Sequence, residues 1–138
     1  MISSKDKTST EENSSVIKEM ISNVKTGKDN PLVVKALIKV VIDDIAYEIY
    51  CVEDYLKSLE DNIKRLSTAE KYCRKMAHSK SENKKNYYLE YAKMYFEKGE
   101  TVDNVLEIKQ NYIEALENRK KRINKLHDEI KVIKRLRI

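Results

Sequence analysis

Hydrophobic residues recur at helical spacing along most of the chain. From residue 42 to residue 66 they follow alternating steps of three and four, the heptad repeat of helices that pack side by side. Its positions are Ile42, Ile45, Ile49, Val52, Leu56, Leu59, Ile63 and Leu66. A second repeat has Val102, Val105, Lys109, Tyr112, Leu116, Arg119, Ile123, Leu126, Ile130, Ile133 and Arg137. Because neither stripe is stable while exposed to water, the repeats predict two long helices that bury each other's apolar side.

Start and stop signals predict where the first helices lie. Residues 1–13 lack apolar periodicity, and we expect them to be mobile. Ser14-Ser15 is expected to cap a short helix that ends at Lys25, before Gly27. Asn30-Pro31 is a strong start signal, an Asn cap followed by a proline in the first helical position. The first long helix is therefore predicted to begin at Pro31.

Similar signals divide the rest of the chain. Ser67 followed by Glu70 has the pattern of a capping box, which predicts a break or bend near Ser67. Residues 78–86 are strongly polar and are the predicted loop, and residues 87–98 form a short aromatic helix that Gly99 ends. Thr101 is the expected cap of the last helix.

Composition narrows the fold class. Only two glycines and one proline are present in 138 residues, too few for the turns of a β-sandwich, a barrel or an α/β domain with a glycine-rich phosphate loop. We therefore predict an all-α protein: a helical bundle or antiparallel coiled-coil hairpin with three main helical segments and a short N-terminal helix. Its expected organisation is a disordered N-terminus over residues 1–13 and a single helical bundle domain over residues 14–138.

Three further patterns concern the environment of the chain. No apolar run reaches about 18 residues and no secretory signal opens the sequence, so we expect a cytoplasmic protein without a membrane span. The two cysteines, Cys51 and Cys73, lie among apolar residues and are expected to be buried thiols. Residues 32–41 are apolar nearly all round, so this segment should be buried on several sides, either inside the domain or against a partner.

The net charge of +5 is a property of the C-terminal part of the chain. Residues 118–138 hold nine Lys or Arg residues against Asp128 and Glu129 alone. A second basic stretch covers residues 71–85 and is followed by tyrosines, which stack on bases and anchor protein interfaces. The expected contacts with nucleic acid or an acidic partner are Lys71, Arg74, Lys75, Lys84, Lys85, Arg119, Lys120, Lys121, Arg122, Lys125, Lys134, Arg135 and Arg137. Tyr87, Tyr88, Tyr91 and Tyr95 are the expected partner contacts, with packing in the core as their other interpretation.

Three charged residues, Lys109, Arg119 and Arg137, interrupt the second heptad repeat. The first interpretation is that their stems pack while their charges reach water or a neighbouring carboxylate. The alternative is a seam that opens towards an acidic or phosphate-bearing partner.

Short motifs give weaker indications. Arg122 and His127 have the Arg-x4-His spacing of HEPN-domain ribonucleases, and this resemblance implies a phosphate-holding Arg and a proton-shuttling His. Residues 87–99 resemble the first helix of a tetratricopeptide repeat, but no second copy follows. The cysteines and histidines lack the spacing of a metal site.

We therefore expect a non-enzymatic binding or regulatory protein without cofactor, metal or small-molecule substrate. It would contact a protein partner, or itself, through its heptad and tyrosine-rich surfaces, while the basic C-terminal helix faces an acidic surface. The alternatives are a nucleic-acid-binding protein and a small basic inhibitor in the nucleic-acid channel of a larger enzyme, similar to viral or archaeal RNA polymerase inhibitors. A HEPN-like ribonuclease is the third possibility.

Overall fold

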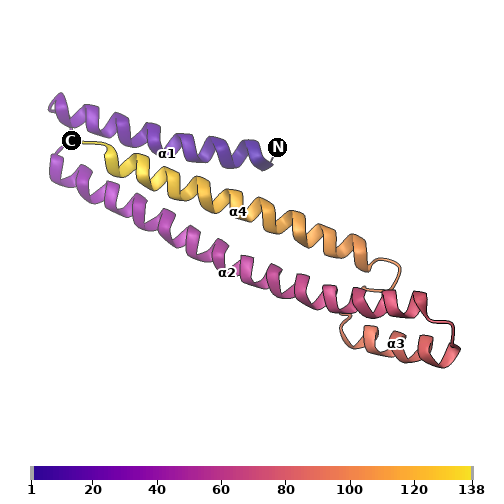
Figure 1. Cartoon of the computed structure of the whole chain (residues 1–138). Coiled ribbons are helices and arrows are strands. Elements are labelled where there is room, and N and C mark those ends of the chain that lie inside the picture. Colours follow the sequence, from indigo (N-terminus) through magenta and orange to yellow (C-terminus); the bar gives the residue numbers. More distant parts are fainter. Residues whose placement is uncertain (1, 138) are drawn as a thin grey trace. The chain divides into compact units, whose positions relative to one another are not determined.

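The computed structural model describes the backbone of residues 2–137 and the side chains of residues 13–137. Its helices are α1 (Ile2–Lys25), α2 (Pro31–His78), α3 (Glu82–Met94) and α4 (Val105–Arg135), and the described range contains no strand (Figure 1). The helices pack against one another, which confirms the predicted all-α bundle. The chain divides into two compact units: unit 1 is Met1–Asp54 with Arg119–Ile138, and unit 2 is Tyr55–Asn118.

Unit 1 packs three helical segments around one core. These are α1, the first half of α2 and the second half of α4. Buried residues from all three segments form the core: Ile17, Ile21, Ile45, Ile49, Leu126 and Ile133. The last four belong to the two heptad repeats, so in this unit the repeats bury each other as predicted.

Unit 2 has a core of its own. Leu66 and Ala69 from α2 meet Val105 from α4, and these three side chains are at most 2% exposed. Half-buried Tyr95 and Phe96, which follow α3, pack against them. One position of each repeat, Leu66 and Val105, is again buried against the other.

The turn between α1 and α2 follows the sequence signals. Asn30 Oδ1 accepts the Leu32 N–H at 2.8 Å, so Asn30 caps α2 as predicted. Gly27 has φ of 79°, the left-handed conformation that ends a helix, and the Lys28 N–H returns to the Asn23 carbonyl at 2.8 Å.

The start of α1 differs from the expectation. The helix begins at Ile2 rather than near Ser14 and contains 24 residues, so the prediction of a short N-terminal helix is wrong. Apolar periodicity reveals only the part of a helix that packs, and residues 2–13 have none, so the pattern missed the first part of α1. The side chains of residues 1–12 lie outside the described residues, and the mobility expected for residues 1–13 stays a prediction.

The predicted break near Ser67 is absent, because α2 continues to His78. The Ser67 hydroxyl donates to the Ile63 carbonyl at 2.7 Å, and the Thr68 hydroxyl donates to the Lys64 carbonyl at 3.2 Å. Hydroxyl groups inside a helix commonly bond back one turn in this way. Glu70, the other half of the expected capping box, is engaged by Lys109 instead.

The polar loop is shorter than predicted. Ser81 caps α3 by accepting the Lys84 N–H, so the loop covers residues 79–81 and residues 82–86 are helical. α3 ends at Met94, and Gly99, with φ of 87°, follows in the connection to α4.

Asn104, rather than Thr101, organises the start of α4. The Asn104 side chain accepts the Thr101 N–H at 2.7 Å and donates to the Gly99 carbonyl at 2.8 Å. The helix begins at Val105, so the predicted Thr101 cap is wrong. An Asn amide can both accept and donate, and it therefore satisfies two backbone groups of this turn where a hydroxyl was expected to satisfy one.

Within the described residues, no helix combines the length and apolar character needed to cross a bilayer.

Candidate binding surfaces

The first half of α2 exposes an apolar face. Val34 is 2% exposed, as predicted for residues 32–41, but Leu32 is 75% and Val40 is 54% exposed. Burial on several sides therefore does not occur within the chain. Only the second option of that prediction, burial against a partner, remains open for these side chains.

This face has its own heptad spacing. Val33, Leu37, Val40, Asp44, Tyr47 and Cys51 follow steps of four, three, four, three and four. At about 100° per residue, they lie roughly 80° to 160° around the helix from Ile45, which faces the core of unit 1. We call this series the α2 stripe. Its four large apolar members, Val33, Leu37, Val40 and Tyr47, are 46–69% exposed.

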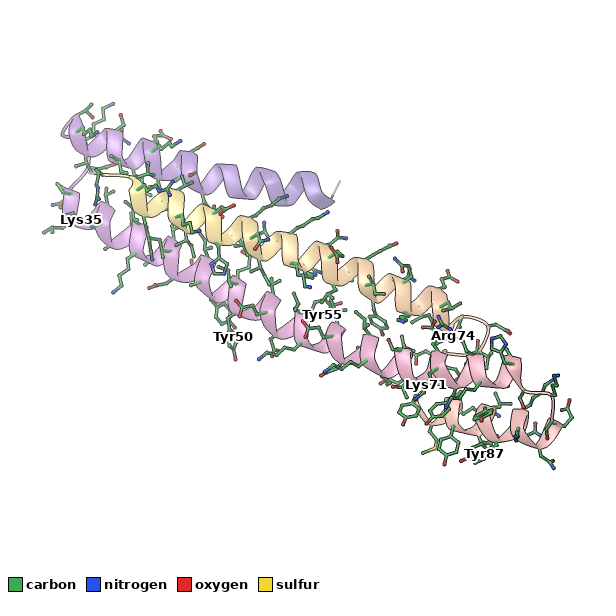
Figure 2. All side chains as sticks on the ribbon, viewed as in Figure 1. Lys35, Tyr50, Tyr55, Lys71, Arg74 and Tyr87 are labelled. Atoms are coloured by element: carbon green, nitrogen blue, oxygen red, sulfur yellow. The ribbon has the colours of Figure 1, made fainter. Side chains whose placement is uncertain are left out.

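The last residue of the α2 stripe, Cys51, differs from the expectation of a buried thiol. Cys51 is exposed rather than buried, whereas Cys73 is half-buried in unit 2. A hydrogen bond with the Cys51 thiol raises the pKa of Tyr47, consistent with two side chains one turn apart on the same face. Tyr50 also points outward from α2 and is 67% exposed (Figure 2). Sequence reasoning missed this stripe because it followed a single register along α2, although the second register is visible in the same residues.

The predicted tyrosine contacts gather in unit 2. The Tyr72 ring of α2 stacks on Tyr91 of α3 with ring centroids 5.2 Å apart, and it lies 6.1 Å from the Tyr95 ring. Tyr87 lies 4.7 Å from Tyr91 and 5.6 Å from Tyr88. Tyr87 is nevertheless 56% exposed, so this cluster serves both packing and surface, as the two interpretations allowed.

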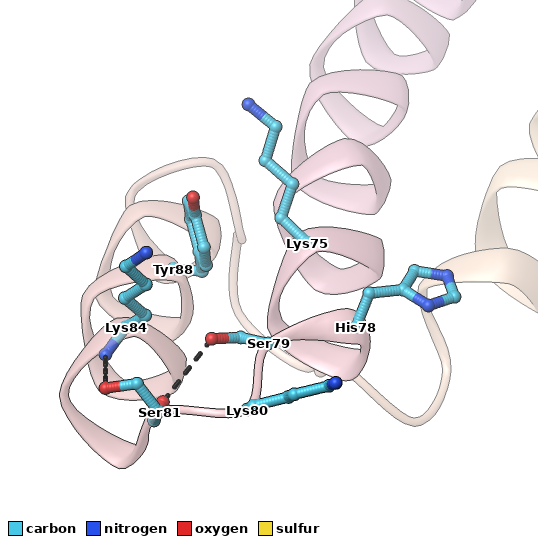
Figure 3. Close-up of a pocket in the computed structure, with 7 residues that line it drawn as sticks. All are labelled: Lys75, His78, Ser79, Lys80, Ser81, Lys84 and Tyr88. Atoms are coloured by element: carbon cyan, nitrogen blue, oxygen red, sulfur yellow. Dashed lines mark hydrogen bonds between the residues drawn. The ribbon is translucent and has the colours of Figure 1, made fainter.

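A basic pocket opens beside these rings at the turn between α2 and α3. It has a volume of about 510 Å³ and no acidic residue in its lining. Its lining residues are Lys75, His78, Ser79, Lys80, Ser81, Lys84 and Tyr88 (Figure 3). The Lys75 Nζ lies 5.8 Å from the centre of the Tyr88 ring, so the lysine and the aromatic wall are adjacent.

The five basic residues predicted as contacts in this region have different surroundings in the structure. Lys75 and Lys84 line the pocket, whereas Lys71 does not. Arg74 is ion-paired with Glu70, and Lys85 lies 4.0 Å from Glu82. Lys80 was missed because it stands in a polar loop rather than on a helix, but it lines the pocket beside the other two lysines.

The basic residues of the second half of α4 belong to unit 1. One of them, Arg122, has a side chain only 11% exposed and donates to Glu48 at 2.6 Å, so it holds α4 to α2. The other predicted contacts of this stretch are exposed: Arg119, Lys120, Lys121, Lys125, Lys134, Arg135 and Arg137. Lys134 and Arg137 line a shallow pocket with Lys35 at the end of this unit.

Lys109 confirms the first interpretation of the interrupted seam. Its Nζ donates to Glu70 at 2.8 Å, and this hydrogen bond is the main reason that the pKa of the Glu70 carboxyl is lowered. Glu70 is 6% exposed, so the pair is part of the packing of unit 2. Arg119 and Arg137 are exposed, as a charge that reaches water requires.

A second buried carboxyl lies in unit 1. Glu129 is 4% exposed, and its Oε1 has no hydrogen-bond partner among the side chains and backbone that the structure describes. Burial raises its pKa, and a hydrogen bond with Asn13 opposes this effect.

The motif shared with HEPN-domain ribonucleases is not assembled in one place. Five residues correspond to about 140° around a helix, so Arg122 and His127 face different sides of α4. Arg122 is turned to Glu48, while His127 is exposed. Among the described residues, no three His, Cys, Asp or Glu side chains are grouped as a metal site.

Comparison of the chain with protein-family models, with curated proteins and with solved structures finds no match.

Proposed function

We propose that this chain is a non-enzymatic binding protein that associates through the α2 stripe, and that the stripe binds a second copy of the chain. The observation that carries the proposal is the exposure of the α2 stripe. Four of its apolar side chains are 46–69% exposed, and the core of unit 1 is formed by other residues. Heptad spacing is the geometry that pairs one helix with another. Contiguous exposed apolar residues of this kind mark sites of protein contact.

Charge along α2 supports a second copy in the antiparallel orientation. Residues 31–42 carry Lys35 and Lys39 and no acidic residue. Residues 43–54 carry five acidic residues, Asp43, Asp44, Glu48, Glu53 and Asp54, and no basic one. A parallel pair would place the acidic halves side by side, whereas an antiparallel pair places each acidic half beside a basic one. Asp44 within the stripe favours one register, because a polar residue in a heptad seam disfavours alternatives.

The solution mass is the first test. The chain has a mass of 16.2 kDa, and we expect light scattering to give twice this value at roughly 100 µM, where association of micromolar strength is nearly complete. The double variant Leu37→Glu/Val40→Glu is expected to be monomeric with an unchanged helical circular dichroism spectrum, since both side chains are exposed in one copy. Leu106→Glu is the matched control, because Leu106 is 61% exposed on α4 and should leave the dimer intact.

Cysteine cross-linking tests the orientation. In an antiparallel pair that overlaps along the whole stripe, position 33 of one copy faces Cys51 of the other, while the two Cys51 residues are about 27 Å apart. In a Cys73→Ser background, oxidation should therefore cross-link the Val33→Cys variant into a covalent dimer but leave Cys51 alone unlinked. A monomeric wild-type protein, or a dimer that survives Leu37→Glu/Val40→Glu, would overturn the proposal. Efficient Cys51–Cys51 linkage without Val33→Cys would refute the antiparallel arrangement.

The basic residues of α4 complete the proposal. Lys120, Lys121 and Lys125 are exposed and lie in the part of α4 that belongs to unit 1. We propose that this face meets an acidic surface, as the charge of the C-terminal segment suggests. A Lys120→Glu/Lys121→Glu variant should remain dimeric, because the α2 stripe is made by a different helix.

A further inference from the structure

We infer that the basic pocket of unit 2 binds single-stranded nucleic acid, with successive phosphates of the strand held by Lys75, Lys80 and Lys84 and a base stacked on the adjacent tyrosines. This inference goes beyond the proposed self-association, since the pocket is formed entirely by residues of unit 2. The two proposals can therefore fail independently.

The electrostatics of the pocket favour an anion. Three lysines and His78 line one open pocket, and among the described side chains Lys75, Lys80 and Lys84 form no ion pair with a carboxylate. Like charges around a common space repel one another, and a phosphate that enters it relieves this repulsion. Glu82 stands between the lining residues Ser81 and Lys84 in the sequence, but it lies 4.0 Å from Lys85 and is not part of the lining.

Polar groups in the same pocket match a phosphate as well. Ser79 and Ser81 contribute hydroxyl groups to the lining, and Ser81 is the residue that caps α3 (Figure 3). The N-terminus of α3, with the positive end of its helix dipole, therefore begins at this pocket. Hydroxyl and amide donors combined with ammonium groups are the usual contacts to phosphate oxygens.

The tyrosines indicate a single strand rather than a duplex. Tyr88 forms one wall of the pocket, and its neighbour Tyr87 is 56% exposed. Tyr72 stacks on Tyr91 and on Tyr95. Tyr87 also lies against Tyr91 and Tyr88, but more than half of its surface is exposed, so Tyr87 and the pocket-lining Tyr88 are the rings that a base can reach. An aromatic ring can stack on a base only when the face of that base is free, as it is in an unpaired strand.

The experiment measures the fluorescence anisotropy of a labelled 15-nucleotide oligothymidylate with the full chain. We expect binding at low salt that weakens as salt rises. The triple variant Lys75→Gln/Lys80→Gln/Lys84→Gln should reduce the affinity at least tenfold and make the logarithmic salt slope shallower by about 2, since each lost contact removes about 0.7. Tyr88→Leu should reduce the affinity at least fivefold, the lower end of the effect for one stacked base.

Matched controls separate this pocket from general attraction to a basic protein. Lys57→Gln/Lys64→Gln/Lys98→Gln removes the same charge from exposed positions of unit 2 outside the pocket, and it should reduce the affinity less than threefold. The Leu37→Glu/Val40→Glu variant should keep the pocket-dependent loss caused by the lysine substitutions, because the pocket does not depend on the α2 stripe. Circular dichroism checks that each variant is folded.

Four results would overturn the inference. The first is no binding of the oligonucleotide at low salt, and the second is an equal loss in the pocket and control triple variants. The third is duplex DNA of the same length binding as tightly as the single strand, with Tyr88→Leu having no effect. The fourth is pocket-dependent binding of inorganic phosphate in calorimetry without binding of the oligonucleotide, which would make this a site for a free anion.

Discussion

Replacement of Arg65 tests how unit 2 is held together. The guanidinium of this α2 residue donates to the Tyr95 carbonyl and to both carboxylate oxygens of Glu100, with 2.9 Å to Oε2. Its side chain is 18% exposed and that of Glu100 is 6% exposed. One arginine thereby ties α2 to the end of α3 and to the connection that leads to α4.

Arg65→Met keeps the apolar stem but leaves the Glu100 carboxylate and the Tyr95 carbonyl without this donor. Removal of one partner from a buried ion pair costs about 3–5 kcal/mol. Partial exposure of Arg65 lets water screen the remaining charge, so we expect a loss of about 2–4 kcal/mol in the free energy of unfolding. Urea unfolding at pH 7, followed by circular dichroism, measures this loss.

A double-mutant cycle with Glu100→Gln provides the control. Because both substitutions break the same interaction, the double variant should be more stable than the sum of the single losses predicts, with a coupling of about 1–3 kcal/mol. Two single losses in the free energy of unfolding that add within about 0.5 kcal/mol would refute the reasoning. A decrease of less than about 0.5 kcal/mol in the free energy of unfolding for Arg65→Met alone would also refute it.

The same pair sets a pH dependence. The hydrogen bond with Arg65 is the main reason that the pKa of Glu100 lies below its ordinary value of 4.5. The carboxylate is therefore favoured in the folded state, and its contribution to stability is present above pH 4.5 and lost as the pH falls through the lowered pKa. Arg65→Met should make unfolding less sensitive to acid in this range.

Three further predictions concern single side chains. Leu126 is 1% exposed in the core of unit 1, so Leu126→Ala should lower the free energy of unfolding in urea by about 2–5 kcal/mol. Leu106→Ala, at an exposed position of α4, should lower it by less than about 0.5 kcal/mol. Similar losses in the two variants would contradict the core assignment. Burial raises the pKa of Glu129, so the free energy of unfolding should fall as the pH rises through that pKa. Glu129→Gln should raise the free energy of unfolding by about 1 kcal/mol at pH 7 and flatten this pH dependence. A less stable variant would show that the carboxylate is needed. Exposed Cys51 should react with a thiol reagent faster than half-buried Cys73, whose pKa burial raises, and equal rates in the folded protein would contradict the two environments.

Part of the candidate sites could be read from the residues alone. The basic stretch over residues 71–85 and the tyrosines that follow it were identified from composition and spacing, and two of its lysines, Lys75 and Lys84, do line the pocket. Lys80 could not be placed, because a residue between two helices has no periodicity to show which way it faces. Arg74 looks equivalent to Lys75 in the sequence, but an ion pair with Glu70 occupies it.

Local sequence was enough to predict that α2 and α4 are helices and which of their apolar sides pack together. Heptad spacing, the Asn30 cap and Gly27 act over one or two helical turns, so the residues that specify these features are close neighbours along the chain. The same local signals could not predict where α2 ends or whether its second apolar face is buried. Ser67 can cap a helix or bond back inside one, and Val40 can lie in a core or on a surface, with the same local residues.

Tertiary structure decided these choices, because each depends on groups that are distant along the chain. Glu70, the predicted capping partner of Ser67, is instead paired with Lys109, 39 residues away along the chain. In unit 1, α1 and α4 cover one side of α2 and leave the α2 stripe exposed. A helix presents side chains all around its axis, and only the packing of its neighbours determines which of them are buried.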